Sequence, residues 1–106
     1  PIMTPYEAPG PSSDEIDATT GPLLLNFGTN WCGHCQAAEP LINEALSEFP
    51  SVQHIKVEDG PGRRLGRSFR VKLWPTVIAL KDGQEVARAV RPESADEVRA
   101  ALAQIA

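Results

Sequence analysis

The sequence predicts a single α/β domain in which a central mixed β-sheet carries helices on both faces. Two observations indicate this fold class. In the first half of the chain, short apolar runs typical of buried strands alternate with stretches of helical periodicity. In the second half, two strands joined by a tight turn precede one more helix. The length of 106 residues suffices for one compact domain with its own core.

The beginning of the chain differs from the rest. Residues 1–11 contain four prolines and follow neither a helical nor a strand period. We therefore expect an irregular arm or a short edge strand there, and the domain proper over residues 12–106. Ser12 begins a run of N-cap candidates followed by acids, which predicts a short helix near residues 13–19. The Gly-Pro pair at positions 21–22 ends it.

A strand and a long helix come next. The apolar run at residues 23–27, in which Asn26 is the one polar member, is typical of a strand buried on both faces. Apolar side chains then recur every three or four positions, which predicts an amphipathic helix over about residues 33–49. These apolar positions are Ala37, Ala38, Leu41, Ile42, Ala45, Leu46 and Phe49. Pro40 should kink this helix because it lacks a backbone donor and clashes one turn back.

Three strands and two helical segments are expected in the remainder. Residues 52–57 should form a strand whose alternation places His54 and Lys56 on one face. A helical turn follows over residues 63–69. The last elements are the strands 76–80 and 85–90, joined at Asp82-Gly83, and a helix that Ser94 caps and that carries Val98, Ala101, Leu102 and Ile105.

Composition and charge argue against several classes of function. The net charge of −4 and the isoelectric point near 5.1 disfavour non-specific binding to nucleic acid or acidic membranes. No apolar run reaches the ~18 residues that a membrane span needs. The first residues also lack the pattern of a signal peptide. We therefore expect a cytoplasmic monomer without nucleic-acid or membrane partners, with the periplasm as the alternative if a signal was removed.

The two cysteines, Cys32 and Cys35, indicate redox chemistry. They lie within four residues, so none is left to join distant parts of the fold. A four-ligand zinc site is disfavoured because only His34 and His54 could complete it. At the start of the predicted helix, a two-residue spacer lets the two sulfurs bond without breaking the helix. The sequence thus predicts a dithiol/disulfide couple, with neither a metal nor another cofactor implied.

The position of Cys32 favours its thiolate. Unpaired amides and the positive end of the helix dipole stabilise a negative charge there by ~0.3–1 kcal/mol. His34 adds to this bias, since an imidazole beside Cys32 can donate a hydrogen bond or a positive charge. Stabilising the thiolate relative to the disulfide makes a couple more oxidising. We therefore predict a higher reduction potential than that of a couple with proline in the spacer.

Several motifs together resemble the thioredoxin family. They are the strand at 23–27, Trp31-Cys32-Gly33-His34-Cys35, Pro40, Trp74-Pro75-Thr76 and Lys81-Asp82-Gly83-Gln84-Glu85. The resemblance covers nearly the whole chain from about Asp14 onward, and the spacer is similar to that of protein disulfide isomerases. It implies a thioredoxin fold and a thiol-disulfide oxidoreductase that works through a mixed disulfide.

The resemblance also implies roles for individual residues. Cys32 would be the attacking nucleophile, Cys35 the resolving thiol and Pro75 the cis-proline facing the sulfurs. Substrate would dock by backbone pairing in a groove, and we expect its contacts to be Trp31, Gly33, Trp74, Thr76 and Arg91. The partners would be protein disulfides and a recycling reductase or small thiol.

The most informative departure from the family is Asn26. Thioredoxins place a buried aspartate at this position and isomerases a glutamate, and that carboxylate is thought to relay a proton for the resolving thiol. Asn26 cannot titrate. Lys56 matches the lysine that usually neighbours the missing acid, and without a partner it would lose its charge and could serve as a base. Water and His54 are the other candidates. His54 fits better as a packed or surface side chain, and Lys56 fits equally well as a side chain whose stem extends to water.

Three further departures affect the groove. Residues 28–30 lack the usual aromatic, so we expect a thinner wall and a more open site. Arg91 replaces a groove-lining glycine and would narrow the docking surface or select acidic substrates. Trp74 is bulkier than the common isoleucine, and it either offers a flat contact to partners or packs against Trp31.

Two questions stay open at this level. Four arginines crowd one helical stretch and form either a solvated face or a docking patch for an acidic protein; they are Arg63, Arg64, Arg67 and Arg70. The function also has a rival, a non-catalytic binding module or chaperone-like adaptor that uses the groove of Trp31, Trp74 and Pro75. Within the enzyme class, a reductase competes with an oxidase or isomerase.

Overall fold

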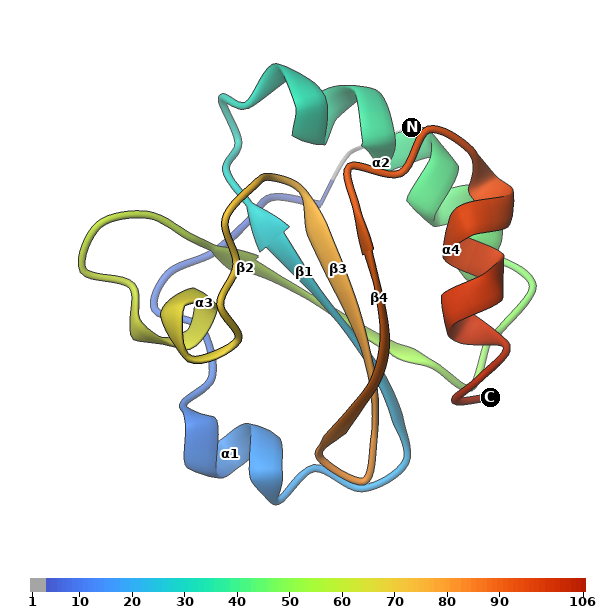
Figure 1. The fold of residues 1–106 in the computed structure, drawn as a ribbon, viewed down its shortest axis with the longest axis horizontal. Coiled ribbons are helices and arrows are strands. Elements are labelled where there is room, and N and C mark those ends of the chain that lie inside the picture. Colours follow the sequence, from blue (N-terminus) through green and yellow to red (C-terminus); the bar gives the residue numbers. More distant parts are fainter. Residues whose placement is uncertain (1–3) are drawn as a thin grey trace.

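The computed structural model describes residues 4–106, which form a four-stranded sheet with helices on both faces (Figure 1). The strands are β1 (Pro22–Gly28), β2 (Gln53–Glu58), β3 (Thr76–Lys81) and β4 (Gln84–Val90). The helices are α1 (Ser13–Asp17), α2 (Gly33–Leu46), α3 (Arg64–Ser68) and α4 (Ala95–Leu102). The fold class expected from the sequence is confirmed.

The sheet is mixed, with the strand order β2-β1-β3-β4. Strand β1 runs parallel to β2, to which α2 connects it, and antiparallel to β3, while β3 and β4 form the antiparallel hairpin. In this register Asn26 of β1 lies opposite Lys56 of β2 on one side and Val77 of β3 on the other. The carboxyl end of β1 therefore lies in the middle of the sheet, directly before α2.

Two apolar clusters hold the layers together. On one face, α2 and α4 cover side chains of β1 and β3; the buried members are Leu24, Ala38, Ile42, Ala45, Val52, Val77, Ala79, Val98, Ala101, Leu102 and Ile105. On the other face, α1 and α3 cover a second cluster of Ile16, Leu23, Leu25, Phe27, Val57, Leu65, Ile78 and Leu80. Strand β1 contributes to both clusters, as expected for a strand buried on both faces.

The helix termini agree with the sequence in most respects. Ser12 caps α1 in a reciprocal capping box with Glu15, and Ser94 accepts a hydrogen bond from the backbone N–H of Glu97 at the start of α4. All four helices end earlier than expected, α1 at Asp17 instead of residue 19 and α3 at Ser68 instead of residue 69. α2 ends at Leu46 instead of residue 49, and α4 ends before Ile105, which is nonetheless fully buried by the turn that follows.

The N-terminal arm lies along the edge of β2. Glu7 forms an isolated parallel bridge with Val57, so the arm adds one pair of backbone contacts to the sheet without forming a regular strand. Residues 1–3 of the predicted arm lie outside the described residues. None of the helices in the described part of the chain has the length and apolar character to cross a membrane.

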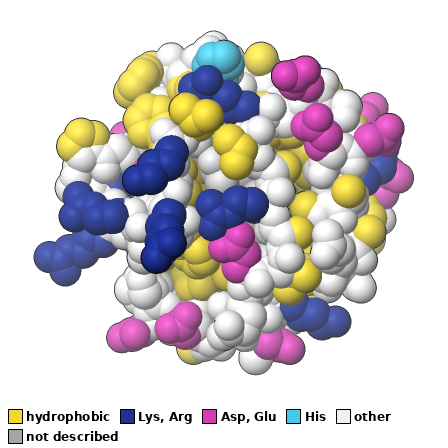
Figure 2. Space-filling view, viewed as in Figure 1, with side chains coloured by type: hydrophobic (Ala, Val, Ile, Leu, Met, Phe, Trp, Pro, Cys, Tyr) yellow, Lys and Arg dark blue, Asp and Glu magenta, His cyan; other side chains and the backbone are white. Residues whose placement is uncertain are grey.

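Charge is distributed unevenly over the surface. Figure 2 shows Lys and Arg side chains gathered over the side where α3 lies, whereas Asp and Glu dominate near α4. Residues 63–72 contain five of the ten Lys and Arg residues of the chain and no acid. The chain thus presents a basic region although its net charge is −4.

Candidate active site

The two cysteines lie where β1 leads into α2. Cys32 is the N-cap of α2, and its Sγ accepts a hydrogen bond from the backbone N–H of Cys35 at 3.4 Å. Both are free thiols. An extended backbone at Cys32 places its sulfur over the unpaired amides of the first helical turn. A thiolate at this sulfur is therefore stabilised by the helix terminus.

The second cysteine is the more deeply buried one. Cys35 is 1% exposed and Cys32 is 8% exposed, and both pack in a small cluster with Tyr6 and Trp74. Burial raises the pKa of the Cys35 thiol to about 11, and the neighbouring Cys32 acts in the same direction. Cys35 is therefore protonated near neutral pH and must lose its proton before it can attack a disulfide.

Two tryptophans form an aromatic rim beside the sulfurs. Trp31 is 73% exposed, and its ring meets that of Trp74 edge to face with centroids 5.8 Å apart. The indole N–H of Trp74 donates to Oδ2 of Asp59 at 2.8 Å. Trp74 thus packs against Trp31, which is one of the two expected alternatives. The hydrogen bond to Asp59 also holds its indole ring in place. Its half-buried side chain still leaves it accessible to a partner.

The loop before β3 lies at the same end of the sheet. The peptide bond between Trp74 and Pro75 is cis. Thr76 pairs with Phe27, so Pro75 lies next to the end of β1, where the cysteine segment begins. Arg91 has a positive φ of 48°; its backbone N–H donates to the carbonyl of Pro75 and its Nε to the carbonyl of Trp74, both at 2.8 Å. Arg91 thereby holds the loop of Trp74 and Pro75 in place through two hydrogen bonds.

The expectation of a thin, open wall at residues 28–30 is wrong. A Cβ built on Gly28 would lie 2.5 Å from the Cys35 Sγ and 2.8 Å from Cζ of Tyr6. The space beside Gly28 is therefore occupied by the ring of Tyr6, which comes from the N-terminal arm and is only 6% exposed. The wall is present, but it comes from a distant part of the sequence.

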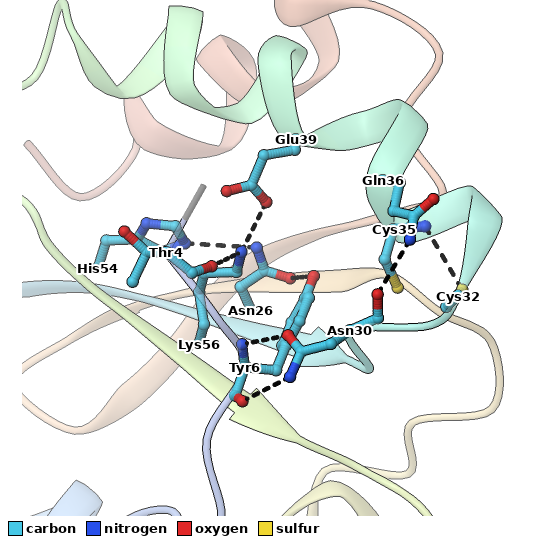
Figure 3. A network of polar contacts seen from close by, with 10 residues as sticks. All are labelled: Thr4, Tyr6, Asn26, Asn30, Cys32, Cys35, Gln36, Glu39, His54 and Lys56. Carbon is cyan, nitrogen blue, oxygen red and sulfur yellow. Dashed lines mark hydrogen bonds and ion pairs between the residues drawn. The ribbon is translucent and has the colours of Figure 1, made fainter. Parts of the chain in front are cut away.

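A chain of polar contacts runs inward from this wall (Figure 3). The hydroxyl of Tyr6 donates to Oδ1 of Asn26 at 2.7 Å, and Nδ2 of Asn26 lies 3.4 Å from Nε2 of His54. Burial lowers the pKa of His54 to about 4, and the positive charge of Lys56 acts in the same direction. His54 is therefore a neutral, half-buried imidazole at neutral pH. Asn26 links it to the wall of the site.

The expectation that Lys56 is buried without a partner is also wrong. Its Nζ lies 2.7 Å from Oε2 of Glu39, and both side chains are only 4% exposed. Nζ also donates to the carbonyl of Thr4 and lies 4.4 Å from the centroid of the Tyr6 ring. Lys56 is therefore engaged in an ion pair with Glu39 and is unsuited to act as a free base.

A hollow of about 390 Å³ connects these groups with the surface. It is lined by Thr4, Pro5, Tyr6, Thr29, Asn30, Cys35, Gln36, Glu39 and Lys56. The Cys35 thiol and the Glu39 carboxylate thus border one space, one helical turn apart on the same face of α2. Within residues 4–106, no three His, Cys, Asp or Glu side chains gather in a way that could hold a metal ion.

Comparisons with known proteins agree with this geometry. The family model for thioredoxin matches residues 12–104, nearly the whole chain. The chain belongs to the thioredoxin family. It resembles the solved structure of reduced thioredoxin 2 from Pseudomonas aeruginosa PAO1, with a TM-score of 0.86 and 59% identity, covering 97% of this chain and 95% of that one.

More distant thioredoxins match over shorter stretches. A thioredoxin from Chlamydia trachomatis is 33% identical over 79 residues, which are 74% of this chain and 78% of that protein. An H-type thioredoxin from Fagopyrum esculentum is 32% identical over 68 residues, which are 64% of this chain. The chain spans 59% of the length of that plant relative. Together these matches agree with membership of the thioredoxin family.

The structure brings together most of the thioredoxin-like residues singled out in the sequence. Cys32, Cys35 and Trp74 are in contact, while Pro75 and Arg91 form the neighbouring loop. His34 and Gly33 lie on the exposed first turn of α2. Asn26 and Lys56 lie behind the cysteines as register neighbours in the sheet.

Three residues of the site were missed by the sequence interpretation: Tyr6, Glu39 and Asp59. Glu39 had a detectable signal, because it lies in the buried stripe of α2 together with Cys35 and Ile42, where an acid is unusual. Tyr6 stands in an arm without periodicity, and Asp59 follows β2 in a loop. Neither carries a local pattern that points to the cysteines.

Proposed function

We propose that this protein reduces protein disulfides by dithiol-disulfide exchange, with Cys32 as the nucleophile and Cys35 as the resolving thiol. The observation that carries this proposal is the pair of free thiols on the first turn of α2, one at the N-cap and one buried below it. The first favours the thiolate form, and the second is held as a thiol until it is needed.

The reaction proceeds in two steps. The Cys32 thiolate attacks one sulfur of a substrate disulfide, a mixed disulfide forms, and the other substrate sulfur leaves as a thiolate that takes up a proton. Cys35 then loses its proton and attacks Sγ of Cys32, which forms the Cys32–Cys35 disulfide and releases the second substrate thiolate. Two electrons pass to the substrate, and a reductase or small thiol returns the protein to its dithiol form.

We place the acceptor of the Cys35 proton at Glu39 rather than at Lys56. Asn26 has no titratable proton, and Lys56 donates to Glu39 and to the carbonyl of Thr4. Glu39 borders the same hollow as Cys35 and carries a carboxylate oxygen. Transfer through this hollow would move the proton from the thiol to the carboxylate and from there to solvent. Lys56 then serves to hold the carboxylate in position.

His34, in the spacer between the two cysteines, is the residue from which we expect a raised reduction potential. It is exposed on the first turn of α2, two residues after Cys32. A donor near this thiolate stabilises the reduced form, so we propose a more oxidising couple than one with proline in the spacer. Replacing His34 with proline should lower the potential measured against a glutathione buffer, and an unchanged value would contradict this role.

Reduction of insulin disulfides tests the proposed activity. Cys32→Ser should abolish turnover, whereas Cys35→Ser should still attack and accumulate a mixed disulfide detectable by mass spectrometry. A different result would support the rival function. If the protein with both cysteines replaced by serine keeps binding its partners and no variant traps a mixed disulfide, the fold serves as a binding module.

A further inference from the structure

The N-terminal arm reaches into the active site through Tyr6. The position that a Cβ of Gly28 would take lies 2.5 Å from Sγ of Cys35 and 2.9 Å from the hydroxyl oxygen of Tyr6. Both atoms therefore border the same small space. Glycine at position 28 is required for this arrangement, because any larger residue would displace the sulfur or the phenol ring.

The arm is fastened to two parts of the fold around this ring, the loop before α2 and strand β2. Asn30, the last of the wall residues 28–30, accepts from the backbone N–H of Tyr6 at 2.7 Å and donates to its carbonyl at 3.1 Å. Lys56 donates to the carbonyl of Thr4, and Glu7 pairs with the edge of β2. These contacts fix the backbone on both sides of Tyr6. The position of its hydroxyl is thereby determined by the fold.

The phenol is suited to donate to a negative sulfur. Burial raises the pKa of Tyr6 well above its usual range, and the Cys35 sulfur adds to this effect, so the hydroxyl keeps its proton. It donates to Asn26 in the present state, in which Cys35 is a thiol. Because a hydroxyl hydrogen can rotate, the same group can turn to a thiolate when one forms.

We propose that Tyr6 is a positioning residue for the resolving step: its ring seats the Cys35 sulfur and its hydroxyl donates to the Cys35 thiolate. This inference rests on the proposed function. The charged or titratable groups that face the phenol are Cys32, Cys35 and Glu39 of α2 and Lys56 of β2. Lys56 and Glu39 pair with each other, which leaves the phenol as the neutral donor that borders the sulfur.

The test is a Tyr6→Phe variant, which removes the donor and keeps the ring. Single-turnover kinetics over a range of pH should show the resolving step slowed about tenfold, as expected for a rise of about one unit in the pKa of Cys35. The pH profile of that step should move to higher pH, and the attack by Cys32 should slow less. A matched Asn30→Ala variant, which loosens the arm, should shift the profile in the same direction by a smaller amount.

The possible results separate this inference from the proposed function. An unchanged pH profile in Tyr6→Phe, with normal formation of the mixed disulfide, overturns the role of Tyr6 alone. Absence of any mixed disulfide in the unmodified protein overturns the proposed function itself. Thermal unfolding of each variant shows whether a slower step reflects loss of the fold, since a purely structural role would lower stability without moving the profile.

A second, independent observation concerns the basic region beside the site. A hollow of about 300 Å³ next to Trp74 is lined by Asp59, Gly60, Arg63, Arg67, Arg70, Val71, Lys72 and Trp74. The acids nearby are already engaged, since Glu58 pairs with Arg63 at 2.9 Å and Asp59 accepts from Trp74. The ion pairs found among residues 4–106 involve none of Arg67, Arg70 and Lys72.

The location of these charges points to substrate choice. Arg67, Arg70 and Lys72 are exposed, and they line the same hollow as Trp74 of the aromatic rim. We infer that this surface recognises protein disulfides flanked by acidic residues, an inference that also rests on the proposed function. Exposed charges act mainly by steering the encounter, so the preference should weaken as salt is added.

Two disulfide-bonded peptides that differ only in flanking Glu or Lys residues test this inference. We expect kcat/KM about tenfold higher for the acidic peptide at low salt and a much smaller ratio at high salt. An Arg67→Glu, Arg70→Glu variant should reverse the preference, whereas the control Lys81→Glu, at the far end of β3, should retain it. Equal rates for both peptides would overturn the inference. The rate with a small uncharged disulfide reports the proposed function separately.

Discussion

The two ends of strand β1 are equally buried but chemically different. Leu23, Leu24 and Leu25 at the start of β1 are at most 1% exposed and belong to the two apolar clusters. At the other end, Asn26 and Thr29 are at most 2% exposed, yet Asn26 contacts the polar groups of Tyr6 and His54, and Thr29 lines the same hollow as Cys35. The comparison shows that burial alone does not distinguish a core from an active site. The residue types placed in the buried positions do.

Helix α2 repeats this division on either side of Pro40. After Pro40 it buries only the apolar Ile42 and Ala45, and before Pro40 it buries Cys35 and Glu39 in addition to Ala38. A buried ion pair such as Glu39–Lys56 contributes little net stability, because desolvation of both charges offsets their attraction. The apolar end therefore stabilises the fold, and the polar end requires an explanation in terms of chemistry. The following predictions test this division, from the largest expected effect to the smallest.

Lys56→Met should cause the largest loss of stability, about 4 kcal/mol, because it leaves the Glu39 carboxylate buried without its partner. Urea denaturation measures the change. Adding Glu39→Gln to the variant should recover at least half of the loss, since neither charge then remains. The exposed pair of Arg63 and Glu58 provides the control, and Arg63→Met should cost less than about 1 kcal/mol. Equal losses at both pairs would remove the distinction between the polar end and the surface.

Leu24→Ala should lower stability by about 3 kcal/mol, through lost apolar burial and the cavity left behind. Its side chain is fully buried in the cluster under α2 and α4. Disulfide reduction per folded molecule should stay close to that of the unmodified protein at a temperature where the variant is folded. A specific loss of turnover would mean that the apolar end also tunes the chemistry.

Acid should destabilise the polar end through His54. The pKa of this group is about 4 in the folded protein and near 6.5 in an unfolded chain. Between these values the unfolded chain binds a proton that the folded protein does not, so stability falls as pH decreases from about 6.5 to 4, by on the order of 2 kcal/mol. His54→Gln should flatten this part of the pH curve. His34→Gln, at an exposed position, should leave it unchanged.

The smallest effect is expected at Thr29. Its hydroxyl oxygen is buried and has no hydrogen-bond partner among the described residues. Thr29→Val keeps the shape and removes the unsatisfied group, so stability should rise by no more than about 1 kcal/mol. Thermal unfolding measures this change. A clear loss of stability would indicate that the hydroxyl has a partner in solution, such as a water in the adjoining hollow.

Much of the fold could be predicted because its signals are local. The alternation of residues 52–57 correctly placed His54 and Lys56 away from Val57, and the Asp82-Gly83 turn correctly predicted the hairpin. Helix ends were less certain, since the turn that buries Ile105 continues the apolar spacing without continuing the helix. Periodicity reports which side chains are buried, and it does not report where the last helical hydrogen bond lies.

The site was predicted only in part. The two cysteines are recognised by their spacing in the sequence, whereas the partner of Lys56 is identified only by its position in the folded structure. The wall beside Gly28 shows the same limit at a position that has no side chain of its own. The sequence pattern correctly indicated that no side chain is present there, and the structure shows Tyr6 in the vacant space.

The sequence by itself determined the α/β architecture, the thiol pair at the start of a helix and the absence of a carboxylate at position 26, since each depends on neighbouring residues or on residue type. The tertiary structure decided what surrounds the resolving thiol. Tyr6 reaches Asn26 across 20 positions, Glu39 reaches Lys56 across 17, and Lys56 reaches Thr4 across 52. Contacts at such separations arise only when the sheet, the helix and the arm pack together. The chemistry of a side chain limits the kinds of group it can bind, but it does not select which residue of the chain becomes its partner.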